Sequence, residues 1–359
     1  MTEPFVPGLE LARLFYREIV GPLLESELSG LRYSAALIGW GSEVLGFDSA
    51  RSTDHNWGPR LQIFVDDGDE DQAAVVSELL GARLPAVFRG YPTVFRASES
   101  ADRPSHWVTV AGLRSWLTGE LGFDPTAGIG LLDWLSVPTQ RLAEITGGAV
   151  FHDGLADLTA TRTALAWYPR DIWLYVLACQ WQRISQEEAF PGRCAEAGDD
   201  LGSALVTARL VGDVMRLVLL MERRYPPYSK WLGTAFGRTA GGGELRPLLT
   251  AALAATTWAE RQQSMSAAYE AAARLHNKTG LTPPLDPAIR PAYYDRPYQV
   301  PDAGRFVAAL RDQISDDRLR ALPLIGAVDQ FIDSTDALGS GSRNLRRAVA
   351  AELAPPPGR

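Results

Sequence analysis

Two short groups of polar residues have types and spacing that suit phosphate and metal chemistry. Gly41 and Ser42 follow an apolar run, and Asp54 and Asn56 come twelve and fourteen residues after Ser42. A glycine lets a phosphate group approach the backbone, and the free amides at the start of a helix attract anions. We therefore interpret Gly41 and Ser42 as candidate contacts for a nucleotide phosphate, with a short helix expected after them.

The aspartate and the asparagine are candidate ligands of Mg²⁺. We expect a strand over residues 54–65, interrupted at Gly58-Pro59. Alternate residues of a strand point to the same face, so Asp54 and Asn56 would share one. Mg²⁺ takes oxygen ligands, commonly one or two carboxylates together with substrate phosphates. Both residues are also candidate catalytic groups, because the metal balances charge that develops on the phosphate.

This arrangement resembles the nucleotidyltransferase superfamily that includes aminoglycoside and lincosamide adenylyltransferases. In that superfamily a Gly-Ser turn is followed on the next strand by Asp-x-Asp or Asp-x-Glu, and the corresponding residues here are Gly41-Ser42 and Asp54-His55-Asn56. Over residues 30–340, the chain looks like the bacterial family DUF4037, which is regarded as nucleotidyltransferase-like. The words that carry this narrower resemblance are DHNWGPR, QEEAFPGR, GDDLGS and YPPYSKWLG.

Two departures from the superfamily pattern bear on activity. Asn56 takes the place of the second acid, which removes a negative charge but leaves an amide oxygen that can bind Mg²⁺. The expected third strand, residues 107–110, carries no carboxylate. Acids that could substitute for the missing ligand are Glu43, Asp48 and Asp133.

Three further residues could complete a nucleotide site, and each has a structural alternative. Arg60 could contact a phosphate or form an ion pair. Lys230 follows a rigid Tyr-Pro-Pro-Tyr turn by two residues. It could contact a triphosphate or pack on aromatic side chains. Asp200 could be the general base that deprotonates an acceptor hydroxyl. Alternatively, Asp199 or Asp200 could be the N-cap of the helix that follows.

A largely apolar helix expected over residues 200–224 carries three charged residues on one face. Arg209, Asp213 and Arg216 recur there at positions i, i+4 and i+7. Buried charges are paired or functional. These residues could form ion pairs within or between helices, or an arginine could bind a phosphate or another acidic group.

The pattern of elements predicts an α+β fold with two domains. Residues 1–155 would form a nucleotidyltransferase-type mixed sheet with helices, and residues 156–359 would form an all-helical domain on the substrate or partner side. We expect strands at 35–38, 54–65 and 107–110, and helices at 7–31, 72–84, 114–121, 133–145, 171–188, 200–224, 245–256, 257–276, 302–314, 318–334 and 342–353.

Composition narrows the class of partners. The net charge of −8 does not suit a nucleic acid, which needs a basic footprint. The apolar runs fall short of the ~18 residues of a membrane helix, so we expect no membrane partner. The two cysteines predict no disulfide framework and a reducing compartment, with the cytoplasm as the default.

Three functions remain open from the sequence. The first is Mg²⁺-dependent transfer of a nucleoside monophosphate, AMP from ATP, to a hydroxyl of a small molecule or protein. The second is a catalytically weakened nucleotide-binding or regulatory protein on the same scaffold. In that case Asn56 would reflect the loss of catalytic activity. The third is a helical interaction protein whose amino-terminal α/β domain is vestigial. The acceptor and the oligomeric state are not specified by the sequence.

Overall fold

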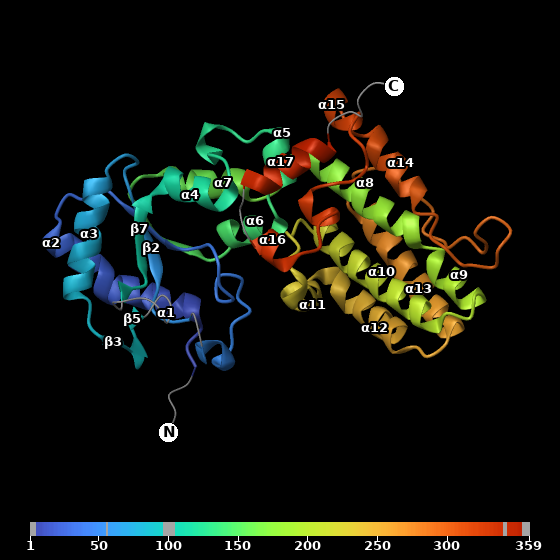
Figure 1. The fold of residues 1–359 in the computed structure, drawn as a ribbon, viewed down its shortest axis with the longest axis horizontal. Helices are drawn as coiled ribbons and strands as arrows, with labels where there is room; N and C mark the ends of the chain where they lie inside the picture. The colour runs from blue at the N-terminus through green and yellow to red at the C-terminus, as the bar shows by residue number, and fades with distance from the viewer. Residues whose placement is uncertain (1–4, 55–56, 96–104, 340–342, 354–359) are drawn as a thin grey trace. The chain divides into compact units, whose positions relative to one another are not determined.

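The computed structural model describes residues 5–54, 57–95, 105–339 and 343–353. Over these residues the fold is mixed α+β, as predicted, with a small sheet near the amino terminus and helices after it (Figure 1). The chain forms two compact units. The α/β unit comprises residues 1–129, 141–166 and 340–343, and the helical unit comprises residues 130–140, 167–339 and 344–359. The sequence predicts two domains that meet at a single boundary after residue 155, whereas the two units of the structure alternate along the chain.

A four-stranded mixed sheet lies at the centre of the α/β unit. Its strand order is β7-β2-β1-β8, with β1 antiparallel to both neighbours and β2 parallel to β7. The sequence did not predict the strand β8, which is short, partly exposed and preceded by two glycines. The bounds of these strands are β1 Ser34–Leu37, β2 Leu61–Val65, β7 Val108–Gly112 and β8 Ala149–Asp153.

Helices cover both faces of this sheet, because β2 directs alternate side chains to opposite sides. Ile63 packs in a cluster with Phe15 and Leu80, whereas Phe64 lies against Trp116 with ring centroids 5.3 Å apart. The unit also contains α1 Gly8–Phe15, η1 Tyr16–Val20, α2 Gly21–Glu27, η2 Ala50–Asp54, α3 Glu70–Arg83, β3 Val87–Phe88, β4 Tyr91–Pro92, β5 Val94–Phe95, β6 Ser105–His106, α4 Leu113–Leu121, η3 Pro125–Ala127 and α7 Asp157–Leu165, with most of α6 Thr139–Thr146.

The first helical run contains a π-helical turn, η1, between α1 and α2. The Gly21 N–H bonds to the Tyr16 carbonyl, five residues back. Pro22 follows immediately and has no N–H for the usual i to i−4 bond, so the wider turn accommodates it without ending the run. The helix expected over residues 7–31 therefore changes its type locally at Gly21-Pro22.

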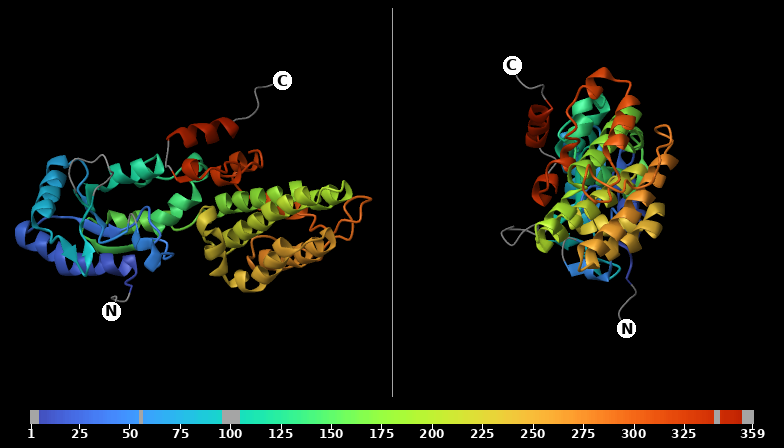
Figure 2. Two further views of the ribbon diagram at one scale, coloured as in Figure 1. Left: turned by 60° about the horizontal axis from the view of Figure 1, so that its bottom comes forward. Right: turned by 90° about the vertical axis from the view of Figure 1, so that its right-hand side faces the viewer.

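The helix α10 (Asp200–Met221) is central to the helical unit. It packs against α8, α9, α11, α12 and α13, and α8 packs against α14, as Figures 1 and 2 show. The stack of Trp181 on Phe306, with centroids 4.3 Å apart, joins α8 to α14. The other bounds are α5 Leu131–Ser136, α8 Arg170–Glu187, α9 Phe190–Glu196, α11 Ser229–Gly237, α12 Ala240–Ala254, α13 Trp258–Lys278, α14 Gly304–Asp312, α15 Asp317–Arg320, η4 Val328–Gln330, α16 Thr335–Gly339 and α17 Arg343–Glu352.

Two predicted helices are wrong in extent, and each fails at a proline. The helix expected over 318–334 ends as α15 at Arg320, before Pro323 and before Gly326, which has a φ of +92°. The helix expected over 133–145 is divided into α5 and α6, with Pro138 between them. A proline disfavours the helical conformation of the residue before it.

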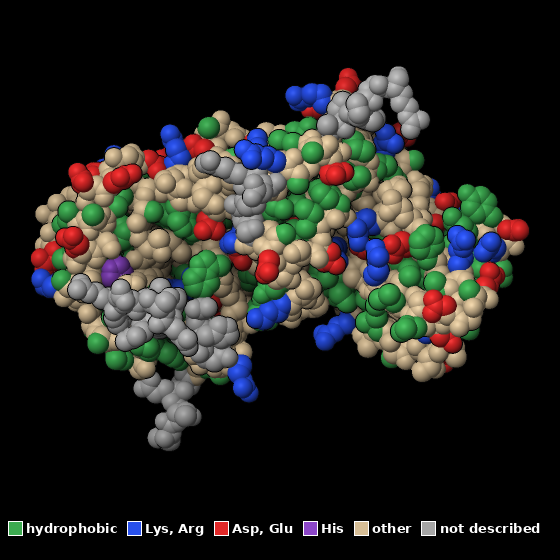
Figure 3. Space-filling view, viewed as in Figure 1, with side chains coloured by type: hydrophobic (Ala, Val, Ile, Leu, Met, Phe, Trp, Pro, Cys, Tyr) green, Lys and Arg blue, Asp and Glu red, His purple; other side chains and the backbone are tan. Residues whose placement is uncertain are grey.

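The described part of the chain contains no helix that is both long and apolar enough to span a membrane. Cys179 and Cys194 are free thiols, in agreement with the expectation of no disulfide. Basic and acidic side chains are interspersed over the helical unit on the face drawn in Figure 3.

The carboxyl group of Glu188 ties the end of α8 to the start of the segment that leads into α14. It accepts a hydrogen bond of 3.0 Å from the Ala303 N–H and is only 6% exposed. Burial raises the pKa of Glu188 to about 7, and the neighbouring Asp302 acts in the same direction. The native state therefore holds this proton at a pH where the unfolded chain has already lost it.

We expect Glu188→Gln to remove a decline in stability between pH ~4.5 and pH ~7. Across this range the native protein binds more protons than the unfolded chain, so its stability falls as the pH rises, by ~3 kcal/mol in total. Glutamine stays neutral and keeps an oxygen for the Ala303 N–H. Urea unfolding at several pH values measures the slope. Glu244→Gln, in an exposed ion pair with Arg274, is the control; an unchanged slope in Glu188→Gln would contradict the assignment.

Candidate functional site

The Gly-Ser turn and the segment before β2 meet at one edge of the sheet. The antiparallel register pairs Ala36 of β1 with Gln62 of β2, which places the end of one strand beside the start of the other. The Gln62 side chain extends this pairing, because its amide donates to the Ile38 carbonyl (3.0 Å) and accepts from the Ile38 N–H (3.1 Å). The proximity of these two sequence segments is therefore a consequence of strand pairing.

Glycines shape the turn that follows β1. Gly39 has a φ of +81° and donates a hydrogen bond of 3.0 Å to the Glu144 carbonyl, and Gly41 has a φ of +134°. Residues with a Cβ rarely adopt such angles. After Gly41 the backbone forms consecutive turns, closed by the bond from Phe47 N–H to the Ser42 carbonyl (2.8 Å). The short helix expected after Ser42 is absent from this described segment.

Arg60 closes over this turn. Its Nε donates to Glu43 Oε1 at 2.6 Å, its Nη2 donates to the Trp40 carbonyl, and its guanidinium carbon lies 4.1 Å from the centre of the Trp40 ring. The side chains of Arg60 and Glu43 are only 4% and 2% exposed. Of the two roles that the sequence leaves open for Arg60, the structure shows the ion pair.

The ion pair also accounts for the glycine at position 41. A Cβ there would overlap Arg60 Nη2 and Glu43 Oε2, in addition to the strained backbone angle. Gly41 is therefore required by the close approach of these two side chains, whether or not a phosphate binds. Ser42 is partly exposed, and its hydroxyl has no hydrogen-bond partner among the described residues. It remains available to a ligand.

The expected strand position of Asp54 is wrong. Asp54 ends the 3-10 helix η2, and β2 begins seven residues later at Leu61, after the Gly58-Pro59 bend. Proline cannot donate to a strand ladder, so regular pairing begins only beyond it. The argument that Asp54 and Asn56 share a strand face therefore fails. Asn56 and His55 lie outside the described residues, and the pairing of Asp54 with Asn56 as metal ligands stays a prediction.

The acids that could have replaced a missing ligand are engaged elsewhere. Glu43 pairs with Arg60. Asp48 accepts hydrogen bonds from the Gly8 N–H (2.7 Å) and from Trp57 Nε1 (3.1 Å), and Asp133 pairs with Arg346. As predicted, β7 carries no carboxylate. The described part of the chain contains no group of three histidine, cysteine or acidic side chains that could hold a metal.

A charged cluster beside the turn was not identified from the sequence. Arg141 bridges two carboxylates, Glu120 of α4 at 3.1 Å and Glu144 of α6 at 2.8 Å. Burial raises the pKa of Glu120; Arg141 opposes this effect and Glu144 adds to it. The backbone of Glu144 contacts Gly39, so the cluster adjoins the turn directly. The sequence shows only that Arg141 and Glu144 are three residues apart on one helix. It cannot show the contact with Glu120, because Glu120 belongs to a different helix.

The two candidates in the helical unit are engaged at the surface. Asp199 caps α10 by accepting from the Gly202 N–H at 2.8 Å, which confirms one of the capping alternatives. Asp200 is 77% exposed and lies 3.3 Å from Arg261 Nη2. Lys230 is exposed, with its Nζ 4.9 Å from the centre of the Trp231 ring. The catalytic role of Asp200 and the phosphate role of Lys230 stay predictions.

Within the described residues, two of the three charged residues on one face of α10 form ion pairs, and the third, Arg216, does not. Arg209 pairs with Glu187 at 2.8 Å, and the buried Asp213 accepts from Arg183 Nε at 2.8 Å. Arg216 has no hydrogen bond or ion pair with the residues that the structure describes. The sequence placed these residues on one face but could not distinguish among them, because their partners come from α8.

Residues 134–232 match a family described as Domain of unknown function (DUF4037). This segment is similar to that family. No curated protein and no solved structure matches the chain. The DUF4037 segment extends from α5 into α11 and contains Asp200, Arg216 and Lys230. The Gly-Ser turn, Arg60 and Asp54 precede it. The family description assigns no function, so the arguments for one come from the residues.

We expect Glu43→Gln to destabilise the protein strongly, because it leaves the Arg60 guanidinium buried without its counter-charge. Removal of one partner from a buried ion pair typically costs ~3–5 kcal/mol. The double variant Glu43→Gln with Arg60→Met should recover part of this loss. Urea unfolding provides the free energies. Glu10→Gln, which breaks an exposed pair with Arg13, is the control, with an expected cost of ~1 kcal/mol or less. Equal costs for the two glutamate variants would refute the importance of the buried pair.

Proposed function

We propose that the α/β unit binds ATP with Mg²⁺ and transfers AMP to a hydroxyl group of a small molecule or a protein. The hydroxyl oxygen would bond to the α-phosphorus as the bond to the β-phosphate breaks, pyrophosphate would leave, and the hydroxyl proton would pass to a base or to water. The observation that carries the proposal is the register of β1 and β2, which brings the Gly-Ser turn to the edge of the sheet where the segment after Asp54 enters β2. In the superfamily that the sequence resembles, a turn and an acidic motif combine in this way around the nucleotide phosphates.

The proposed roles follow from the chemistry of the side chains. The Ser42 hydroxyl and the backbone after Gly41 would contact the phosphates. Asp54 and Asn56 would hold Mg²⁺, since a carboxylate and an amide oxygen are both suitable hard ligands. The bound ion would neutralise charge on the transferred phosphate. Arg60 would hold the turn in place through Glu43 and Trp40.

A second candidate is a nucleotide-binding or regulatory protein that has lost turnover. Asn56, in place of a second acid, reduces the negative charge available to the ion. This difference favours binding without chemistry. For either function we propose the cytoplasm as the location, because it supplies ATP and Mg²⁺ and keeps thiols reduced.

The decisive experiment measures binding and transfer separately. Thermal unfolding with ATP and Mg²⁺ reports binding, because a ligand that binds only the native state raises the melting temperature. Incubation with ATP labelled in the α-phosphate and a metabolite pool reports transfer of AMP. We expect both signals in the native protein. Asp54→Ala should reduce transfer by ~100-fold or more, since the ion contributes several kcal/mol to transition-state stabilisation.

Controls distinguish the two candidates. Asp66→Asn removes an exposed acid just after β2 and should change neither signal. Stabilisation by ATP without any labelled product would favour the regulatory protein. In that case Asn56→Asp should restore transfer if only charge is lacking. Absence of both stabilisation and transfer would reject both candidates.

A further inference from the structure

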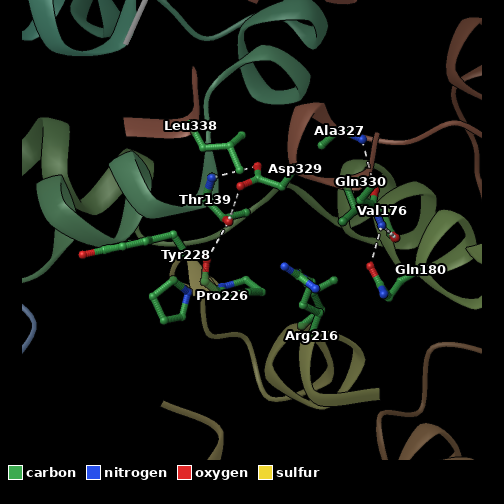
Figure 4. A pocket seen from close by; sticks show the side chains of 12 residues that line it. Thr139, Val176, Gln180, Arg216, Pro226, Tyr228, Ala327, Asp329, Gln330 and Leu338 are labelled. Carbon is green, nitrogen blue, oxygen red and sulfur yellow. Dashed lines mark hydrogen bonds between the residues drawn. The ribbon is translucent and has the colours of Figure 1, made fainter. Parts of the chain in front are cut away.

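A small cavity lies within the helical unit and is built from residues of that unit alone (Figure 4). Its walls come from α8, α10, the Pro226-Pro227 segment and η4. The cavity has a volume of about 20 Å³, which is room for one small polar group. Val176, Leu220 and Pro226 make part of the wall apolar. The cavity therefore has the dimensions of a site for the end of a small molecule.

The guanidinium of Arg216 points into this cavity. Figure 4 shows it directed into the space between Pro226 and Gln330. The side chain is partly buried and, within the described part of the chain, has no hydrogen bond or ion pair. An arginine presents five N–H donors in a planar fork, and the Arg216 nitrogens are not among the fully buried side-chain atoms that lack a partner, so they stay accessible. Its donors are suitably placed for a ligand.

The other polar groups of the cavity are already bonded. Asp329 accepts hydrogen bonds from the N–H (2.9 Å) and the hydroxyl (2.9 Å) of Thr139. Gln330 donates to the Val176 carbonyl (3.0 Å) and to Gln180 Oε1 (3.1 Å). Among the described lining residues, Arg216 is thus the charged group whose hydrogen bonds remain to be made.

The acid in the wall restricts the charge of a ligand. Burial raises the pKa of Asp329, while the bonds from Thr139 and the charge of Arg216 oppose this effect. In its ionised form this carboxylate repels a dianionic phosphate more strongly than a monoanion. A carboxylate has a single charge, and its two oxygens match the guanidinium fork.

We propose that this cavity binds the carboxylate of a small monocarboxylic acid through paired hydrogen bonds from Arg216. The short alkyl part of the acid would contact Leu220 and Pro226. The site is independent of the nucleotide function proposed for the α/β unit, because none of its residues belongs to that unit.

Calorimetric titration of the full chain with propionate tests the proposal. Propionate should bind saturably, whereas propionamide, which has the same shape without the charge, should not. Arg216→Gln should weaken propionate binding by at least about tenfold, the loss expected for a charge-assisted pair. Arg209→Gln is the matched control, because Arg209 is on the same helix but pairs with Glu187. It should leave the affinity unchanged.

Folding and ligand class are checked in the same series. Without ligand, Arg216→Gln should stay folded and melt at or below the temperature of the native protein, because the Arg216 charge favours the ionised form of the buried Asp329. Propionate binding that is equal in native and Arg216→Gln proteins would overturn the proposal. So would tighter binding of inorganic phosphate than of propionate, or the absence of saturable propionate binding.

Discussion

The buried ion pair between Arg60 and Glu43 is the constraint on which the candidate site depends. Two charged side chains are removed from water, and they are stable there because each is balanced and Arg60 also binds the Trp40 carbonyl. Their approach requires the glycine at position 41 and fixes the turn after β1. The chain that leads into β2 is held against that turn by the same contacts. A catalytic or binding role of this edge would rest on this arrangement.

Buried hydrogen bonds and an ion pair also connect the helices at the centre of the helical unit. Asp213 of α10 accepts from Arg183 and from Gln180 of α8, and Gln180 in turn accepts from Gln330. Such connected bonds satisfy every participant and fix the register of the packed elements. Arg216, one turn along α10 from Asp213, lies at the end of this network without joining it by any described bond. This contrast distinguishes an arginine that supports packing from one that is open to a ligand.

The two units therefore offer different kinds of chemistry. The nucleotide site proposed for the α/β unit rests on the turn after β1, the Ser42 hydroxyl and the position of Asp54 at the end of η2. The DUF4037 segment contributes a long central helix and most of the residues that line the small cavity. The proposals for the two sites can be tested separately, because no residue is shared between them.

The sequence by itself determined the fold class, the strand β1 and the positions of the long helices α3, α8, α10 and α13, because periodicity and end signals such as Asp69 and Thr257 act within one or two turns. It also identified Gly41 and Arg60 as candidate phosphate contacts and placed Arg216 on a charged helix face with Arg209 and Asp213. Only the tertiary structure decided what they do. Arg60 meets Glu43 across 17 residues, Asp329 meets Thr139 across 190, and Pro59 delays the start of β2 beyond Asp54. Such contacts depend on how distant elements pack, which no local pattern encodes.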